Sequence, residues 1–506
     1  MSLPDVNAYS AAFQHPDLCL SDLSLKRCTI RTNPLGQPRV RSGGFALTYN
    51  LFSSNANWAV RCFHRESPDR DKRYGAISRR LNAQDIKGSG YFVGFEFQPQ
   101  GITMPNGGKF PIVKMAWAAG ETMGSFLDNR HSDKTALQNL RNSLVRLSTF
   151  LRSRNIAHGD IQPGNIMVSD MGRKIQLIDY DGMFVDEIKG LDATEIGLPN
   201  FQHPERRTKT PWNANLDNFS FIVLDIALAI LQDNPKYWEK TQSGDDKVLF
   251  SAQDYAVPEA SSIFNELNND IRYSGFISKL RSICRLSIEK TPRIEELATW
   301  KPVDVVPRAV TGSVERTKYI AAYPVVDGLD MCGIAAHDGK VVEIIGKVLE
   351  VKMLNTGPNH QNHPNSPYCF VSFEIWRPGM DQSFRLILWS EELEKLTQKG
   401  ITNIHTHFNG KYISITGLVE KREKIIPAKT IPPKGRWPAR TYPERMAITY
   451  SICADSATVT FISKQESDFR LGRVQRNLTV SHVTTAAAPS SGQTGNASIL
   501  DRIRRI

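Results

Sequence analysis

Two acidic residues and an amide occur in the chain at a spacing that could support transfer of a phosphoryl group. Asp160 and Asn165 are five residues apart, and Asp179 follows fourteen residues later between β-prone residues. Metal-assisted phosphoryl transfer needs one carboxylate that receives or orients the attacking hydroxyl group. It also needs an amide oxygen and a second carboxylate that hold Mg²⁺ against the phosphates. Because this chemistry depends mostly on positioning and charge neutralisation, few side chains are required.

The segments around these residues resemble those of a known family. HGDIQPGN at 158–165 and the downstream DYDG resemble the catalytic loop HRDxKxxN and the metal-binding DFG of the eukaryotic-type protein kinase superfamily. The resemblance implies that Asp160 is the catalytic base, that Asn165 and Asp179 are catalytic metal ligands, and that ATP and Mg²⁺ are the cofactors. Asp181, at the place of the DFG glycine, is a further candidate metal ligand.

Later motifs bear on which kind of kinase the chain resembles. HGD is also similar to aminoglycoside phosphotransferases and other small-molecule kinases. GLPNFQHPE at 197–205 resembles the end of a protein-kinase activation segment, and DNFS at 217–220 resembles the start of the kinase F helix. Small-molecule kinases generally lack these elements. The resemblance also implies a buried, structural ion pair between Glu205 and Arg293.

The nucleotide-binding residues are expected in the strand-rich N-terminal part of the resemblance. A double glycine followed by an aromatic residue resembles a glycine-rich loop, because glycine lets the backbone approach a phosphate. The candidates are this loop with its tip, the cation at the place of the VAIK lysine, the gatekeeper and the hinge: Gly43, Gly44, Phe45, Arg61, Met115 and Trp117.

Four positions depart from the kinase pattern. Arg61 replaces the phosphate-binding lysine, and the next helix has no glutamate partner where Arg73 or Tyr74 falls. Gly159 replaces the arginine of HRD, which makes activation by loop phosphorylation less expected, and Gln162 replaces the lysine of the catalytic loop. Arginine can contact a phosphate bidentately but is not isosteric with lysine. The alternative to an active enzyme is therefore a nucleotide-binding pseudokinase that acts as a scaffold.

The pattern of the elements predicts an α+β chain with several domains. Strand-like runs followed by helical periodicity predict two lobes. The resemblance, which covers residues 30–300, implies that they form a bilobal protein-kinase-like fold. A Pro- and Gly-containing linker is expected at 301–339. Five strands with a short helix after the third resemble a small OB-like β-barrel at 340–480. Residues 481–506 are expected to be a flexible tail with a short amphipathic C-terminal segment.

The charge of the chain is concentrated near its C-terminal end. The formal net charge is +11, and residues 340–506 hold 23 Lys and Arg against 14 Asp and Glu, which leaves +9 in the last third. A single-stranded nucleic acid or another anionic partner is therefore expected at the OB-like module. The aromatic candidates for base stacking, about half of which alternation should direct into the core, are Phe370, Phe373, Trp376, Phe384 and Trp389.

Several bulk features restrict the remaining function classes. No apolar run reaches the length of a membrane span, and the first residues do not form a secretory signal. The seven cysteines are scattered without a CxxC pair, which fits a cytoplasmic protein. The sequence thus predicts an ATP-dependent protein kinase, Ser/Thr-specific by analogy, that acts on a protein hydroxyl. The pseudokinase and a small-molecule phosphotransferase of the aminoglycoside-kinase type stay open as alternatives.

Overall fold

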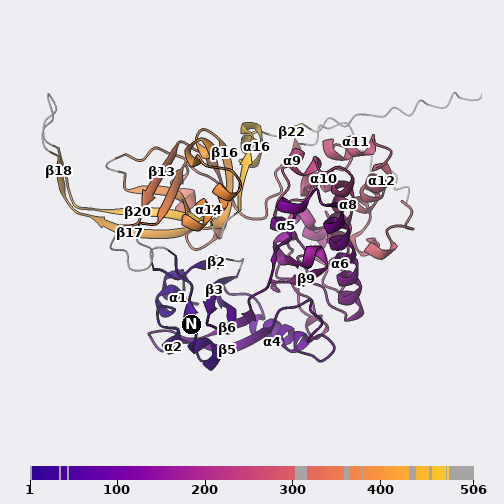
Figure 1. Ribbon diagram of the computed structural model, residues 1–506, viewed down its shortest axis with the longest axis horizontal. Helices are drawn as coiled ribbons and strands as arrows, with labels where there is room; N and C mark the ends of the chain where they lie inside the picture. Colours follow the sequence, from indigo (N-terminus) through magenta and orange to yellow (C-terminus); the bar gives the residue numbers. More distant parts are fainter. Residues whose placement is uncertain are drawn as a thin grey trace, which may run out of the picture.

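The protein has an α+β fold in which three bodies pack together (Figure 1). The computed structural model describes residues 3–33, 36–42, 45–302, 316–357, 365–377, 380–431, 440–454, 458–474 and 476–477. A strand-rich N-terminal lobe, a helical lobe and a C-terminal module of two sheets follow one another along the chain. None of the helices in these ranges is long and apolar enough to cross a membrane.

The N-terminal lobe is built on an antiparallel sheet of six strands. In spatial order these are β1 (Thr29–Ile30), β3 (Ala46–Phe52), β4 (Asn57–Phe63), β6 (Lys109–Ala116) and β5 (Phe95–Thr103), with β2 (Val40–Ser42) also paired to β3. Helix α4 (Arg70–Leu81) packs on one face, where its buried Tyr74 and Ile77 share a hydrophobic core with Phe95. The predicted strands around 46–52 and 57–63 are therefore present, and they bring Arg61 into the sheet.

Three short helices cover the other face of this sheet. They are α1 (Val6–Ala12), α2 (Pro16–Cys19) and α3 (Leu23–Lys26). Tyr9 and Phe13 are fully buried in the same cluster as Tyr49. The Tyr9 hydroxyl donates a hydrogen bond of 2.8 Å to the carbonyl of Phe63. Residues before the predicted domain start thus belong to the core of the lobe, which explains why β3 is buried along most of its length.

The helical lobe is centred on two long helices. Its elements are β7 (Glu121–Thr122), α5 (Met123–Arg130), α6 (Lys134–Ser153), β8 (Ile166–Ser169), β9 (Lys174–Leu177), α7 (Arg206–Lys209), α8 (Asn218–Asp233), α9 (Tyr237–Lys240), α10 (Ala252–Ala256), α11 (Ser262–Asn268) and α12 (Ser274–Arg285). The Asp133 side chain caps α6, and its leucines at helical spacing are buried as predicted. The apolar α8 is buried nearly all round. This rigid pair holds the loops that carry the predicted catalytic residues.

The C-terminal module contains two sheets. One has the order β11 (Val325–Asp327), β12 (Val341–Lys347), β16 (Tyr412–Leu418) and β21 (Thr458–Ile462); the other has the order β13 (Glu350–Asn355), β14 (Pro367–Ser372), β15 (Gln382–Leu388), β20 (Arg445–Cys453) and β17 (Glu420–Ile426). Its helices are α13 (Met331–Ala335), α14 (Ser390–Gln398), α15 (Ile404–Phe408) and α16 (Lys464–Arg470). Two short pairs are added, β10 (Arg316–Thr317) with β22 (Arg476–Asn477) and β18 (Lys429–Ile431) with β19 (Arg440–Tyr442). Both β11 and α13 fall within the predicted linker.

The sequence predicted a small OB-like β-barrel here, and the described residues form two sheets that share consecutive segments of the chain. The chain crosses from the first sheet to the second where one strand changes partners. The backbone N–H of Val348 bonds to Lys411 O in the first sheet, and the next N–H, of Leu349, bonds to Ser372 O in the second. The chain thus passes from β12 in the first sheet directly into β13 in the second. The predicted tail at 481–506 lies outside the described residues.

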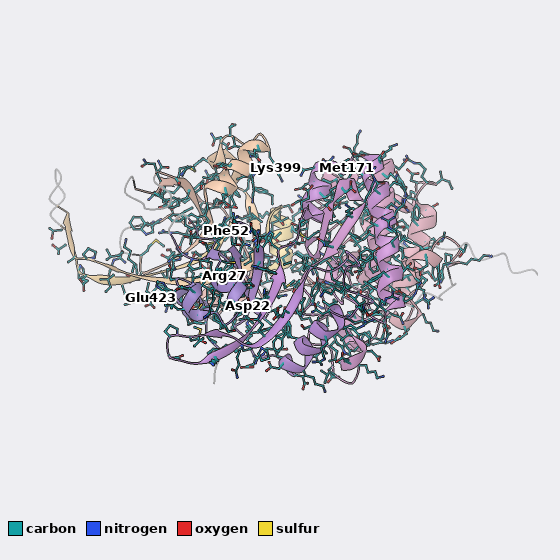
Figure 2. The ribbon with its side chains drawn as sticks, turned by 60° about the horizontal axis from the view of Figure 1, so that its bottom comes forward. Asp22, Arg27, Phe52, Met171, Lys399 and Glu423 are labelled. Atoms are coloured by element: carbon teal, nitrogen blue, oxygen red, sulfur yellow. The ribbon has the colours of Figure 1, made fainter. Side chains whose placement is uncertain are left out.

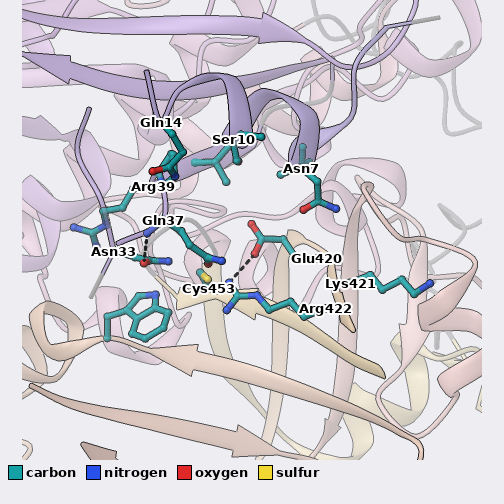
Figure 3. Close-up of a pocket in the computed structure, with 15 residues that line it drawn as sticks. Asn7, Ser10, Gln14, Asn33, Gln37, Arg39, Glu420, Lys421, Arg422 and Cys453 are labelled. Atoms are coloured by element: carbon teal, nitrogen blue, oxygen red, sulfur yellow. Dashed lines mark hydrogen bonds and ion pairs between the residues drawn. The ribbon is translucent and has the colours of Figure 1, made fainter. Parts of the chain in front are cut away.

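The C-terminal module contacts both lobes. Arg39 pairs with Glu391 at 2.5 Å, and a cavity of about 280 Å³ lies beside this contact between α1 and β17 (Figure 3). Lys399, labelled in Figure 2 on the side of the module that faces the helical lobe, pairs with Asp128 at 3.0 Å. The module is therefore held against the N-terminal lobe by one ion pair and against the helical lobe by the other.

A carboxyl group at this junction gives a prediction about stability. Burial, together with the charges of Asp245 and Glu343, raises the pKa of Asp246 to about 6. A carboxyl whose pKa is higher in the folded than in the unfolded state loses stabilising effect as pH rises from about 4 to about 6. We expect Asp246→Asn to raise the free energy of unfolding at pH 8 by up to about 2 kcal/mol, measured by urea denaturation. At about pH 4 the gain should vanish, and an equal gain at both pH values would contradict the burial argument.

Candidate active site

The loop that carries Asp160 is hydrogen-bonded to Asp217 at the start of α8. The carboxylate of Asp217 accepts hydrogen bonds from the backbone N–H groups of His158, at 2.6 Å, and of Gly159, at 2.8 Å. The His158 ring contacts the carbonyl of Ile178 through Nε2 at 2.9 Å. Because Ile178 directly precedes Asp179, these bonds link the catalytic loop to the predicted metal-binding segment.

The carboxylate of Asp160 is held by three donors. Its Oδ1 accepts from the backbone N–H of Leu198 at 2.7 Å, and its Oδ2 accepts from the side-chain amides of Gln162 and Asn165, both at 2.9 Å. Burial raises the pKa of Asp160, and the nearby charge of Asp179 adds to this effect. A fixed carboxylate with a raised pKa is suited to accept a proton from a substrate hydroxyl group.

Asn165 and Asp179 supply oxygens of the type that Mg²⁺ prefers. Asn165 is buried and uses its amide nitrogen for bonds to both the carbonyl and the carboxylate of Asp160, which directs its amide oxygen to the other side. Asp179 lies in the left-handed region at φ 64°, and its side chain is 40% exposed. Both residues therefore fit their predicted role as metal ligands.

Arg61 bridges both acids of the DYD segment. Its Nη1 lies 2.7 Å from Asp179 Oδ1 and its Nη2 lies 2.6 Å from Asp181 Oδ2. Burial alone would raise the pKa of Asp179, but the charge of Arg61 outweighs it and leaves that pKa below its ordinary value. A guanidinium group can hold two carboxylates at once, which a lysine ammonium does less well. The arginine that stands in place of the lysine thus has a second carboxylate partner, Asp181, in addition to Asp179.

Asp181 is the acid that pairs with Arg61, in place of the helix glutamate that the sequence analysis did not find. Its Oδ1 accepts a bond of 2.6 Å from the Tyr74 hydroxyl of α4, while its Oδ2 pairs with Arg61. Helix α4 is therefore connected to Arg61 through Tyr74, which stands where the helix lacks its glutamate. Because both oxygens of Asp181 have protein partners and its side chain is only 3% exposed, the geometry favours a structural role over the predicted role as a metal ligand.

Gly159 is required by its position. It has φ 79°, and a Cβ atom there would lie 2.1 Å from the carbonyl oxygen of Gly182. No arginine could stand here as in HRD. A cation is present nearby nevertheless. Arg206 is fully buried, and its burial lowers the pKa of its guanidinium group, while the charges of Asp217 and Asp160 act in the opposite direction. The sequence analysis did not identify Arg206, since it follows the HPE motif and has no counterpart in the pattern.

The predicted nucleotide-binding residues are only partly described. Gly43 and Gly44 lie outside the described residues, while the carbonyl of Phe45 accepts a bond from His64 N at 3.1 Å at the end of β4. Met115 is buried in β6 beside Ala59 of β4, as a gatekeeper would be.

The predicted hinge follows directly after β6. The backbone N–H of Trp117 bonds to Asn57 O at 2.9 Å, and its ring is 38% exposed. Arg41 of β2 lies over that ring at 5.7 Å. These contacts place β2, the strand before the predicted glycine-rich loop, beside the predicted hinge.

The predicted ion pair between Glu205 and Arg293 is wrong. Glu205 instead pairs with Lys209 at 2.8 Å, one turn along α7, and accepts a bond from Ile288 N. Arg293 lies within 3.6 Å of Glu296. For each of the two residues an ion-pair partner three or four positions along the chain therefore replaces the long-range partner.

An acid that the sequence analysis missed, Glu195, lies near the predicted catalytic residues. Burial raises the pKa of Glu195 well above its ordinary value, and the charges of Asp181, Asp179 and Asp160 raise it further. Glu195 belongs to the activation-like segment before Gly197, and no motif marked it. Among the described residues no three His, Cys, Asp or Glu side chains form a metal-binding group.

Comparisons with known proteins give distant relatives. No family model matches the chain. The chain is 28% identical over 108 residues to the probable serine/threonine-protein kinase mkcD of Dictyostelium discoideum, which covers 21% of this chain and 16% of that protein. It is 22% identical over 207 residues to the inhibitor of nuclear factor kappa-B kinase subunit alpha of Gallus gallus, covering 38% of this chain and 26% of that protein. These partial similarities indicate a distant, kinase-like relationship.

Proposed function

We propose that the protein is an ATP- and Mg²⁺-dependent protein kinase that phosphorylates a protein hydroxyl group. The observation that carries this proposal is the carboxylate of Asp160, fixed by three hydrogen bonds in the same site as Asp179 and Arg61. The kinase names of the distant relatives support the same class of chemistry. Specificity for serine and threonine is proposed by analogy alone.

Each residue of the site has a distinct task in this proposal. ATP would supply the phosphoryl group, and Mg²⁺ would neutralise its charge. Asp160 orients the acceptor hydroxyl and takes its proton. Asn165 and Asp179 offer the oxygens for the metal, and Arg61, already placed against Asp179, offers a guanidinium group to the phosphates. Asp181 and Tyr74 keep Arg61 in place.

The proposal is tested by phosphotransfer from radiolabelled ATP to a generic protein acceptor. We expect incorporation by the wild-type protein and its loss in Asp179→Ala, because that variant lacks the main metal ligand. Asp17→Ala is the matched control, because Asp17 is an exposed aspartate of α2, and this variant should retain incorporation. Equal incorporation by Asp179→Ala would indicate a contaminating kinase.

The same assay separates the two alternatives. Absence of turnover, together with stabilisation of the fold by ATP on heating, would favour the pseudokinase. Turnover on a small alcohol but on no protein would favour a small-molecule phosphotransferase.

A second proposed activity is binding of single-stranded nucleic acid by the C-terminal module. The five-stranded sheet has a cavity of about 280 Å³ lined by aromatic and basic side chains, among them Lys352, Phe370, Trp376, Arg385 and Lys424. Arg385 lies over the Phe370 ring at 4.7 Å, and Trp376 is 41% exposed. In the five-stranded sheet the spatial order is β13, β14, β15, β20 and β17, and in the other sheet β16 pairs with β12. This order supports an OB-like domain.

The remaining stacking candidates serve the core instead. Phe373, Phe384 and Trp389 are each 2% exposed, and the rings of Phe373 and Phe384 stack on each other. Phe370 of β14 and Trp376, which follows that strand, thus remain as candidates to contact a ligand. An exposed aromatic ring flanked by cations suits base stacking along a phosphate backbone.

We expect Trp376→Ala to weaken binding of a single-stranded oligonucleotide about 5- to 150-fold, because stacking contributes about 1–3 kcal/mol per base. Fluorescence anisotropy at several salt concentrations would measure this loss. Phe52→Ala is the matched control, since Phe52 is an exposed aromatic residue of the N-terminal lobe that Figure 2 labels. An equal loss in both variants, or no binding by the wild-type protein, would contradict the proposal.

A further inference from the structure

The C-terminal module is attached to the two lobes in different ways (Figure 1). Leu418, at the end of β16, is 3% exposed and belongs to the same hydrophobic cluster as Leu47 and Tyr49 of the N-terminal lobe. In the part of the chain that the structure describes, no hydrophobic cluster holds side chains from both the module and the helical lobe. The apolar part of the attachment is therefore made to the N-terminal lobe.

The ion pairs on the two sides of the module also differ in exposure. Toward the N-terminal lobe, the exposed Glu391 pairs with Arg39, whose side chain is 13% exposed. Toward the helical lobe, Lys399 pairs with Asp128 of α5, and these side chains are 58% and 39% exposed. An ion pair with two exposed members contributes little to stability, and salt weakens it further. The contact with the helical lobe is therefore the weaker of the two.

The chain that leads into the module makes a second exposed contact with the helical lobe. The Tyr319 hydroxyl donates a bond of 3.1 Å to Glu343 of β12, and the Arg470 guanidinium lies over the Tyr319 ring at 4.9 Å. These contacts fix this segment to the module. Two residues later, the carbonyl of Ala321 accepts an exposed bond of 2.7 Å from Arg207 of α7. Both contacts with the helical lobe are thus polar and accessible to water.

The two lobes themselves meet at another place. The backbone N–H of Leu177 bonds to Tyr91 O at 2.8 Å, and Val93 and Leu177 lie in one hydrophobic cluster. A rotation of the lobes about this contact would separate Arg61 from Asp179, which now lie 2.7 Å apart across the candidate active site. Hinge motions of this kind admit and release ligands that bind between two lobes.

We propose that the C-terminal module is a latch on the two lobes. It moves with the N-terminal lobe as one body, and its contacts through Lys399 and Ala321 hold the helical lobe closed against that body. Interfaces between domains permit relative motion unless they are large and hydrophobic, and the contact with the helical lobe is polar. When these contacts break, the lobes rotate apart and nucleotide exchanges faster. The statement about nucleotide rests on the proposed kinase function, whereas the motion of the module does not.

The experiment measures two distances in the full chain by pulsed electron paramagnetic resonance. One spin label is attached to Cys332, an exposed cysteine of the module, in a Cys453→Ser background. The second label is attached through Leu18→Cys in the N-terminal lobe or through Ile271→Cys in the helical lobe, both at exposed positions. Lys399→Glu places a like charge opposite Asp128. We expect this variant, and salt at about 1 M, to add a second, longer distance to the helical lobe and to leave one distance to the N-terminal lobe.

The matched control is Lys395→Glu, the same change of charge on the same helix. Lys395 is exposed, and its ion-pair partner is Glu392 of α14 itself. This variant should keep the wild-type distances. A single, unchanged distance to the helical lobe in Lys399→Glu and at high salt would overturn the latch. A second distance to both lobes would also overturn it, because the module would then leave the N-terminal lobe as well.

Release of a fluorescent ADP analogue, followed by stopped flow, tests the effect of the latch on nucleotide exchange. Release should be about 1.5- to 5-fold faster in Lys399→Glu than in the wild-type protein and in Lys395→Glu, the range that loss of an exposed ion pair allows. Equal release in all three proteins would overturn the control of exchange by the module. If the wild-type protein binds no nucleotide, the proposed function fails, and the two label distances still decide whether the module moves with the N-terminal lobe.

Discussion

Asp160→Asn should lower the turnover number for phosphotransfer by about 10²- to 10⁴-fold, the usual contribution of a general base. Asparagine has the same shape, and its side-chain oxygen can still accept the bond from Leu198 N. It cannot take the proton of the acceptor hydroxyl. The fold should therefore remain while the chemical step is lost. Initial rates with saturating ATP, compared with thermal unfolding of the same preparations, measure the two effects separately.

The pH dependence of the reaction gives an independent check on this role. The base must be ionised to act, and burial raises the pKa of Asp160. The wild-type rate should therefore fall on the acidic side at a pH above the ordinary aspartate value of about 4. The residual rate of Asp160→Asn should show no such fall. A variant with the wild-type rate and the wild-type pH profile would show that another group serves as the base.

Arg61→Met should destabilise the folded protein by about 3–5 kcal/mol, the usual effect of removing one member of a buried ion pair. Arg61 is 4% exposed and pairs with both Asp179 and Asp181. Without it, Asp181 keeps only the Tyr74 hydroxyl as its side-chain partner. Urea denaturation at pH 8 measures the loss.

The acid dependence of this loss identifies its cause. Burial already raises the pKa of Asp181 to about 6 in the presence of Arg61, and removal of the cation should raise it further. A carboxyl with a raised folded-state pKa is protonated and tolerated at low pH, so the penalty of Arg61→Met should be smaller at about pH 5 than at about pH 8. Adding Asp181→Asn to Arg61→Met should recover part of the loss at pH 8. A loss below about 1 kcal/mol in the single variant would contradict the importance of this pair.

Some of the candidate site could be predicted because its signals are local. Asp160, Asn165 and Asp179 occur within 20 residues of one another, and the leucines of α6 repeat at helical spacing. Such patterns depend on backbone geometry over one or two elements, so they can be interpreted without knowledge of the remaining chain. The N-terminal helices α1 to α3 carried no such motif, and only packing showed that Tyr9 completes the core of the lobe.

The tertiary structure alone decided which charges pair. Asp181 lies 120 residues from Arg61, and nothing in the spacing of either residue shows that they meet. Glu205 was predicted to pair with the distant Arg293, but it pairs with Lys209, one turn away in α7. Pairing of this kind depends on the distance left between side chains after the lobes have packed.

The sequence by itself thus determined which chemical groups the chain offers to the proposed function, namely two carboxylates, an amide and a guanidinium group. It also determined the periodicity of the elements that carry them, because residue type and local spacing are properties of short segments. The tertiary structure decided that Asp181 and Tyr74 hold Arg61 and that Phe370 and Trp376 line the same cavity. These outcomes depend on contacts between segments far apart in the chain, and such contacts are settled by the packing of whole bodies against each other.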